Sequence, residues 1–177
     1  MLGVKRNMVT LMPHNEAWET LYEQTRLEIQ EILGDNIIDI QHVGSTAVAG
    51  IAAKPILDIA VSVRSAADLN YDDMLARGYK FAGEAGVPGR FFFARYRDMD
   101  ISTHHIHCYE PNNPDYLNQV AFRDFLNAHP EYAVQYNDLK QSLAAAYAND
   151  RETYTKEKAA FIRLILGLAQ NPSKVDI

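Results

Sequence analysis

The segment ILDIAVSV, residues 56–63, restricts the fold of this chain more than any other feature because it is almost continuously apolar. Apolar runs of this length, rich in β-branched residues, are typical of central strands buried on both faces of a sheet. The exception is Asp58, since an unpaired carboxylate is costly to bury. The sequence therefore predicts a central strand whose carboxylate is balanced by a structural cation, a metal ion or a ligand.

The rest of the first half mixes helical and strand patterns. Apolar spacing predicts helices over 15–33 and 66–77, ended by Gly34 and Gly78. The segment GSTAVAGIAAK, residues 44–54, is expected to turn and to contain a short helix limited by Gly50 and Pro55. Runs of β-branched and aromatic residues predict further strands, at 37–43, 79–83, 90–97 and 101–109, the last two forming a hairpin.

After Pro114 the pattern becomes helical. Helices are predicted over 120–129, 130–148 and 150–170, with Asp150 as an N-cap. The tail at 171–177 is expected to fray. The prediction is an α/β (α+β) fold in a single domain over 1–177. A mixed sheet flanked by helices forms a core over about 1–110, and a helical part over about 115–170 packs on it.

Composition limits the class of protein. A length of 177 residues suits one globular domain with a real core. The formal charge of −6 argues against non-specific nucleic-acid binding, which needs a basic surface, but it permits a local basic pocket. A lone cysteine, Cys108, excludes an intrachain disulfide. No signal peptide or membrane-spanning run is recognisable, so we expect a soluble, cytoplasmic protein.

Two features near the predicted central strand suggest phosphate chemistry. The turn Gly44-Ser45-Thr46 follows a strand, and its backbone N–H groups and hydroxyls suit an anion, although such turns are usually only turns. Asp58, with Lys54 just before its strand, suits Mg²⁺ held against phosphates because this ion prefers oxygen ligands. The alternative for Asp58 is an ion pair with Lys54 or an arginine.

His105 and His107 lie two residues apart in a predicted strand, so they share one face. Two imidazoles on one face can bind a metal or donate hydrogen bonds to phosphate oxygens. His42, on an earlier strand, is a third histidine that could lie nearby. The alternative for each histidine is a structural role.

The helical half carries two tyrosine–lysine pairs at i,i+4 spacing, Tyr136 with Lys140 and Tyr154 with Lys158. Such faces can contact a base ring and phosphates. Packed tyrosines beside lysines that extend to solvent give the same pattern. Two arginines whose direction the sequence leaves open, Arg90 and Arg123, are further cations.

Several blocks, HVGSTAVAGIAAKPILDI, GRFFF, HIHCY, FRDFLNAHPEYAVQYNDLK and DRETYTKEKAAFI, resemble the GrpB family, also called UPF0157. The resemblance extends from about Trp18 to Ile165. The family is assigned to the nucleotidyltransferase fold superfamily, which implies a nucleotidyltransferase-like mixed sheet flanked by helices. In such enzymes a glycine-serine turn, here Gly44 and Ser45, holds phosphate. Carboxylates on the next strand, the first matching Asp58, bind Mg²⁺ or Mn²⁺ ions that align an acceptor hydroxyl with the α-phosphate of a nucleoside triphosphate.

The chain departs from the superfamily pattern at two places. The usual second carboxylate falls on Ala60, and the later strand offers His105 and His107 in place of an acid. The metal ligands are therefore Asp58 with histidine, or the two-metal mechanism is absent. The family's usual Val-Pro-Gly reads Val-Ala-Gly here, which loosens the loop without removing a chemical group.

The leading hypothesis is transfer of a nucleotidyl group to a small molecule, with Asp58, His105 and His107 as catalytic residues. Phosphate contacts are assigned to Lys54, Arg123, Lys140 and Lys158. One alternative is a non-catalytic module that binds a nucleotide or a coenzyme A precursor, since GrpB-like domains also occur fused to dephospho-coenzyme A kinase. A metal-dependent hydrolase using the two histidines is another. In each case the expected partner is a nucleotide or another phosphorylated small molecule.

Overall fold

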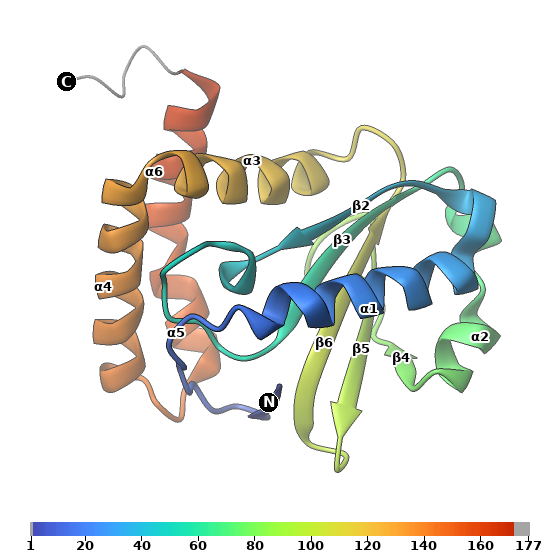
Figure 1. Cartoon of the computed structure of the whole chain (residues 1–177), viewed down its shortest axis with the longest axis horizontal. Helices are drawn as coiled ribbons and strands as arrows, with labels where there is room; N and C mark the ends of the chain where they lie inside the picture. Colours follow the sequence, from blue (N-terminus) through green and yellow to red (C-terminus); the bar gives the residue numbers. More distant parts are fainter. Residues whose placement is uncertain (1, 172–177) are drawn as a thin grey trace.

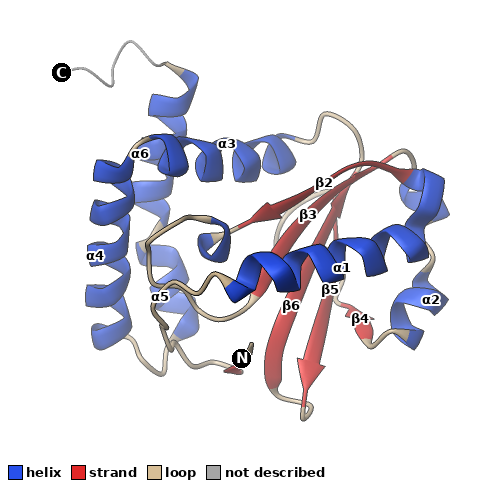
Figure 2. Ribbon diagram, viewed as in Figure 1, coloured by secondary structure: helices blue, strands red, loops and turns tan. Residues whose placement is uncertain are grey.

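The computed structural model describes residues 2–171 as one mixed β-sheet with helices around it (Figures 1 and 2). The strands are β1 (Val4–Lys5), β2 (Ile37–Val43), β3 (Leu57–Val63), β4 (Tyr79–Phe81), β5 (Arg90–Arg97) and β6 (Ile101–Tyr109). The α-helices are α1 (Ala17–Leu33), α2 (Tyr71–Ala76), α3 (Pro114–Ala128), α4 (Pro130–Ala146), α5 (Arg151–Glu157) and α6 (Ala159–Gln170). Most of the tail that was expected to fray, residues 172–177, lies outside the described residues.

The sheet confirms the predicted central position of β3. The strand order is β2-β3-β6-β5-β4, and β1 also pairs with β6. Strands β3 and β6 run parallel, and the other pairs run antiparallel. The predicted hairpin is the β5–β6 pair. The mixed sheet flanked by helices is thus the fold that the sequence predicted.

The two faces of the sheet have different chemistry. On one face, Ile59, Val61 and Val63 of β3 join the apolar core that α1 and α2 cover. Successive strand residues point to opposite faces, so Asp58 of β3 and the histidines two residues apart on β6 point to the other face. That face looks toward the helical part of the chain.

The helical part has a second apolar core, built from α3, α4 and α6. Val48 and Ile51, from the loop between β2 and β3, are buried in it. The loop over 44–56 is therefore packed against helices that come more than 70 residues later in the sequence, as Figure 1 shows.

Four predicted helices differ in the structure. The 44–54 segment contains only a three-residue 3₁₀ turn, η2 (Ser45–Ala47). The 66–77 helix divides into η3 (Ala66–Asp68) and α2, since the Asn70 side chain accepts a hydrogen bond from the Asp73 N–H and starts a new helix.

The final predicted helix divides at Lys158 into α5 and α6. The N-cap prediction for Asp150 is confirmed, because its carboxylate accepts a hydrogen bond from the Thr153 N–H at 3.0 Å. Helix α3 starts at Pro114, six residues before its predicted start, after an Asn113 side chain that caps it. Over the described residues, none of the helices is both long and apolar enough to cross a membrane.

Candidate functional site

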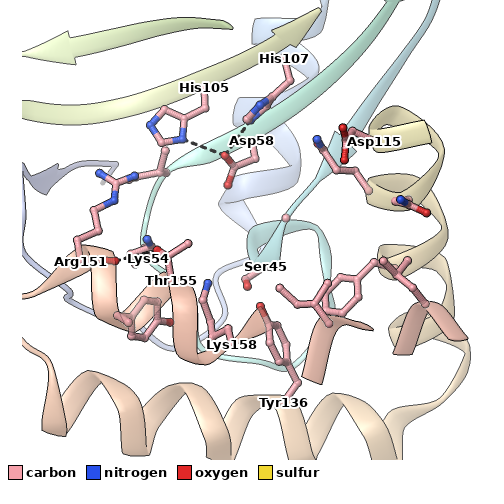
Figure 3. Close-up of a pocket in the computed structure, with 18 residues that line it drawn as sticks. Ser45, Lys54, Asp58, His105, His107, Asp115, Tyr136, Arg151, Thr155 and Lys158 are labelled. Carbon is pink, nitrogen blue, oxygen red and sulfur yellow. Dashed lines mark hydrogen bonds and ion pairs between the residues drawn. The ribbon is translucent and has the colours of Figure 1, made fainter. Parts of the chain in front are cut away.

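A pocket with a volume of about 420 Å³ lies between the polar face of the sheet and the helical part (Figure 3). Its sheet side is formed by the loop before β3, by β3 and by β6. Its other sides are formed by α3, α4, α5 and α6. Residues far apart in the sequence therefore meet in one cavity.

Asp58 and the two histidines form the sheet side of this pocket. In the parallel β3–β6 pair, Asp58 is directly opposite His105, and His107 is one pleat further along. The Asp58 Oδ1 atom is 3.0 Å from His105 Nδ1 and 3.3 Å from His107 Nε2. Burial alone would raise the pKa of Asp58, but these two hydrogen bonds outweigh it and hold the pKa well below its usual value. The carboxylate is therefore ionised at neutral pH.

The proton positions on the histidines follow from their other neighbours. Arg90 Nη1 lies 3.3 Å from His107 Nδ1, and a guanidinium has donors only. His107 Nδ1 must therefore accept, so its proton is on Nε2 and points to Asp58. Burial lowers the pKa of His107, which keeps the ring neutral. On His105, Nδ1 donates to the ionised Asp58, and Nε2 lies 2.9 Å from the Ser102 hydroxyl.

The second oxygen of Asp58 points toward the Gly44 turn. A Cβ at Gly44 would lie 2.7 Å from Asp58 Oδ2, so this close approach requires glycine. Gly44 also has φ 71° and ψ −172°, a conformation that is almost restricted to glycine. The result is a carboxylate whose Oδ1 is held by two imidazoles and whose Oδ2 is directed to the turn.

The cluster can be tested as a metal site. Asp58, His105 and His107 each offer a ligand atom, and these atoms lie within 4.8 Å of one another. A histidine that binds a metal normally donates its other ring N–H to an acceptor. His107 has Arg90 at that position, so it does not fit as a ligand. Asp58 Oδ2 does fit a hard cation such as Mg²⁺, which binds one or two carboxylates together with substrate phosphates.

One end of the pocket, where the loop before β3 meets α5, is cationic. Lys54, Lys158 and Arg151 line it, and the two lysine ammonium groups lie 5.2 and 4.6 Å from the centre of the Tyr154 ring. Burial and mutual repulsion lower the pKa of Lys54 to about 7. Burial also lowers the pKa of Lys158 to about 8. Partly buried cations with depressed pKa values favour an anionic ligand, which would restore their charge.

Three side chains of the helical part hold the loop that carries Lys54. Asn127 accepts from the Ala49 N–H and donates to the Ala47 carbonyl, each at 3.0 Å. Asn137 accepts from the Ala52 N–H at 2.8 Å. The Lys140 ammonium donates to the Ala52 carbonyl. These bonds replace the helical bonds that the 44–54 segment was expected to make.

The pocket brings together nine of the residues that the sequence singled out, namely Gly44, Ser45, Lys54, Asp58, His105, His107, Tyr136, Tyr154 and Lys158. Five others do not line it: His42, Thr46, Arg90, Arg123 and Lys140.

The surroundings of these five side chains explain their positions. His42 stacks on Tyr22 and contacts the Thr46 hydroxyl at 3.0 Å. Arg123 donates to the His42 carbonyl at 2.7 Å, so it fixes the end of β2. Arg90 lies behind His107, and the Lys140 ammonium is directed to the loop backbone. The structure thus places these side chains in support of the pocket wall.

Sequence reasoning missed five polar residues of the pocket, Asp115, Asn118, Gln119, Arg151 and Thr155. The first three share one face of α3 with Phe122, at spacing i, i+3, i+4 and i+7. The Asn-Pro pair at 113–114, a helix-start signal, would have extended the predicted helix to include them. Arg151 and Thr155 belong to the same helix as Tyr154, on which only the tyrosine–lysine spacing was considered.

Comparison with known proteins gives consistent matches. The family model described as GrpB protein matches residues 8–167. The glutamate-rich protein GrpB of Alkalihalophilus pseudofirmus is 37% identical over 171 residues, which cover 94% of this chain and 98% of that protein. The UPF0157 protein YqkA of Bacillus subtilis is 36% identical over 89% of this chain, but the match spans only 46% of YqkA.

A solved structure matches as well. The crystal structure of the conserved protein GrpB from Enterococcus faecalis aligns with a TM-score of 0.85 and 32% identity. The alignment covers 93% of this chain and 99% of that one. The match includes both the sheet and most of the helical part.

Proposed function

The chain belongs to the GrpB family, and on that premise we propose that its pocket binds a nucleoside triphosphate with Mg²⁺ and transfers the nucleotidyl group to a small-molecule hydroxyl. The observation that carries this proposal is that an ionised carboxylate, Asp58, lines the same pocket as three cations. The resemblance of the chain to nucleotidyltransferases supplies the reaction type.

The cations suit a polyphosphate. Lys54, Lys158 and Arg151 reach the pocket from two separate segments, so they can contact different phosphate groups. Arginine adds planar two-point contacts, whereas lysine acts as a point charge. The Tyr154 ring lies under both ammonium groups, a cation–π arrangement that holds the two charges beside each other. We assign the leaving pyrophosphate to this cationic side.

Asp58 is assigned to the metal. When bound there, Mg²⁺ supplies charge stabilisation to the phosphate oxygens. His105 and His107 act through Asp58: their N–H donors hold its Oδ1 and keep it ionised. In the transfer step the acceptor oxygen bonds to the α-phosphorus, and the bond from that phosphorus to pyrophosphate breaks. The hydroxyl proton leaves to water.

Titration calorimetry with ATP and Mg²⁺ tests the binding part of this proposal. Lys158→Met should weaken binding by about tenfold to a hundredfold, the loss of one charge-assisted hydrogen bond. Lys156→Met is the matched control, because Lys156 is exposed on the neighbouring turn and does not line the pocket. If the wild type and Lys158→Met bind ATP with equal affinity, the phosphates do not bind at this site.

Pyrophosphate release tests the chemical part. The wild type, given each nucleoside triphosphate with Mg²⁺ or Mn²⁺ and a pool of hydroxyl acceptors, should release pyrophosphate. Asp58→Asn keeps the shape of the side chain but loses the charge, so release should fall by at least about a hundredfold. Release that is unchanged in Asp58→Asn would contradict the assigned role.

A non-catalytic nucleotide-binding module is the second candidate, and Ala60 favours it. Ala60 is fully buried on the Asp58 face, packed with Val43 and Tyr109, so the place of a second carboxylate is filled by apolar contacts. This candidate predicts the same loss of ATP affinity in Lys158→Met but no turnover by the wild type. A hydrolase built on the two histidines has less support, because Arg90 occupies the far side of His107.

A further inference from the structure

We infer that the α3 side of the pocket binds the acceptor, and that the acceptor is a neutral or cationic hydroxyl compound and not an acid. The inference rests on the proposed function for the direction of the reaction. The chemistry of the α3 residues gives it an independent basis. It names a subsite that the sequence did not indicate.

The α3 side is rich in hydrogen-bond acceptors. Asp115, Asn118 and Gln119 all line the pocket from this helix. The Asp115 carboxylate makes no hydrogen bond or ion pair to another side chain among residues 2–171. Gln119 uses its amide N–H on the Tyr109 hydroxyl at 2.6 Å, which leaves its carbonyl oxygen available. A ligand at this side can therefore donate hydrogen bonds to the Asp115 carboxylate and to the Gln119 carbonyl oxygen.

The cationic side lies across the pocket. Figure 3 shows Arg151 and Asp115 on opposite sides of Asp58, with Lys54 and Lys158 nearer to Arg151. In phosphoryl and nucleotidyl transfer, the attacking and leaving oxygens are roughly in line through the phosphorus. If the leaving phosphates occupy the cationic side, the acceptor approaches from the α3 side.

The charge of the α3 side decides which acceptors fit. Arg123 belongs to this helix and Arg90 lies near it, but both guanidinium groups are directed elsewhere. Arg90 donates to His107 and to backbone carbonyls of the 84–85 turn, and Arg123 donates to the end of β2. In the described part of the chain no cation from α3 lines the pocket, so the Asp115 carboxylate makes the α3 side of the pocket negative. An anionic acceptor would be repelled by the Asp115 carboxylate.

Three hexoses of similar size test the inference: glucosamine, glucose and glucuronate. Their binding is measured by ligand-observed NMR in mildly acidic buffer, where the amine is protonated. The series is run with and without a non-hydrolysable ATP analogue and Mg²⁺. The expected order is glucosamine, then glucose, then glucuronate, with about a tenfold or larger gap between the first and last.

Asp115→Asn should reduce that gap to below about threefold while leaving the affinity for the ATP analogue unchanged. The matched control is Asp138→Asn, the same change at an exposed position of α4 outside the pocket. It should keep the wild-type order, which separates a local effect from the overall negative charge of the protein. Circular dichroism checks that both variants fold.

The outcomes separate this inference from the proposed function. If the ATP analogue binds but glucuronate binds as well as glucosamine, or no hexose binds, the acceptor subsite is wrong and nucleotide binding stands. An unchanged preference in Asp115→Asn also overturns the subsite. If the analogue fails to bind while the charge order depends on Asp115, the subsite stands and the nucleotidyl-transfer proposal falls.

Discussion

Gly44→Ala adds one methyl group to the pocket wall. It should lower the free energy of unfolding more than a methyl group added at any other position of that wall. The new Cβ would lie 2.7 Å from Asp58 Oδ2 and 3.0 Å from Asp58 Cβ. It would also force a residue with a side chain into φ 71°, ψ −172°. The change therefore combines backbone strain with a collision against the carboxylate.

The expected loss of unfolding free energy is the sum of these two effects. Backbone strain in a glycine-only region costs about 1–3 kcal/mol. Overpacking a buried contact costs about 1–3 kcal/mol more. The expected loss in unfolding free energy is thus about 2–6 kcal/mol, a large fraction of the roughly 5–15 kcal/mol typical of a domain.

Urea unfolding followed by the fluorescence of Trp18, the single tryptophan, measures this loss. Trp18 is 2% exposed and reports on the core. Gly50→Ala is the matched control, since Gly50 also has positive φ (75°) but nothing lies within 4 Å of its added Cβ. It should cost about 1–2 kcal/mol.

A double-mutant cycle isolates the collision. Asp58→Ala removes the carboxylate that the new methyl group meets, so Gly44→Ala should cost less in that background by about 1–3 kcal/mol. The reasoning is refuted if Gly44→Ala costs no more than Gly50→Ala, or if its cost is the same with and without the Asp58 carboxylate.

Three further predictions concern the same pocket. Burial is the main cause of the lowered pKa of His107, and the Arg90 charge adds to it, so Arg90→Met should raise that pKa in an NMR titration; an unchanged value would mean that Arg90 does not act on this ring. Because burial lowers the pKa values of Lys54 and Lys158 to about 7 and 8, both lose charge as pH rises through that range. Affinity for sulfate, whose own charge is constant there, should fall in calorimetry between mildly acidic and mildly alkaline buffer; a flat profile would show that neither lysine contacts the anion. Asn127→Ala removes two hydrogen bonds to the loop backbone and should lower the unfolding free energy, measured in urea, by about 1–3 kcal/mol. A loss near zero would mean that the loop is held by its apolar residues.

Local patterns were sufficient for most of the sheet. The strands at 37–43, 90–97 and 101–109 have their predicted bounds because period-2 and continuous apolar patterns depend on neighbouring residues alone. The helix breaks at Asn70 and Lys158 were missed. The cap at Asn70 competes locally with a continuous helix pattern, and residues 151–170 carry no proline or strong stop signal at the break.

Part of the pocket also followed from the sequence. Asp58 was recognised because a charge inside an apolar strand requires a partner, and the histidine pair because alternation places both side chains on one face. Arg123 and Lys140 were expected at phosphates but lie outside the pocket. Their ends are taken by backbone carbonyls of β2 and the β2–β3 loop, contacts with residues about 80 to 90 positions away.

The sequence by itself therefore determined the family, every strand except β1 and about half of the residues that line the pocket. The tertiary structure decided the pairing: Asp58 opposite His105, Arg90 behind His107, and Asp115 across from Arg151. The physical reason is that periodicity specifies which face a side chain occupies. Strand register and helix packing specify which distant side chain it meets. Those neighbours in turn decide which ring nitrogen of His107 carries the proton and which charge lies on each side of the pocket.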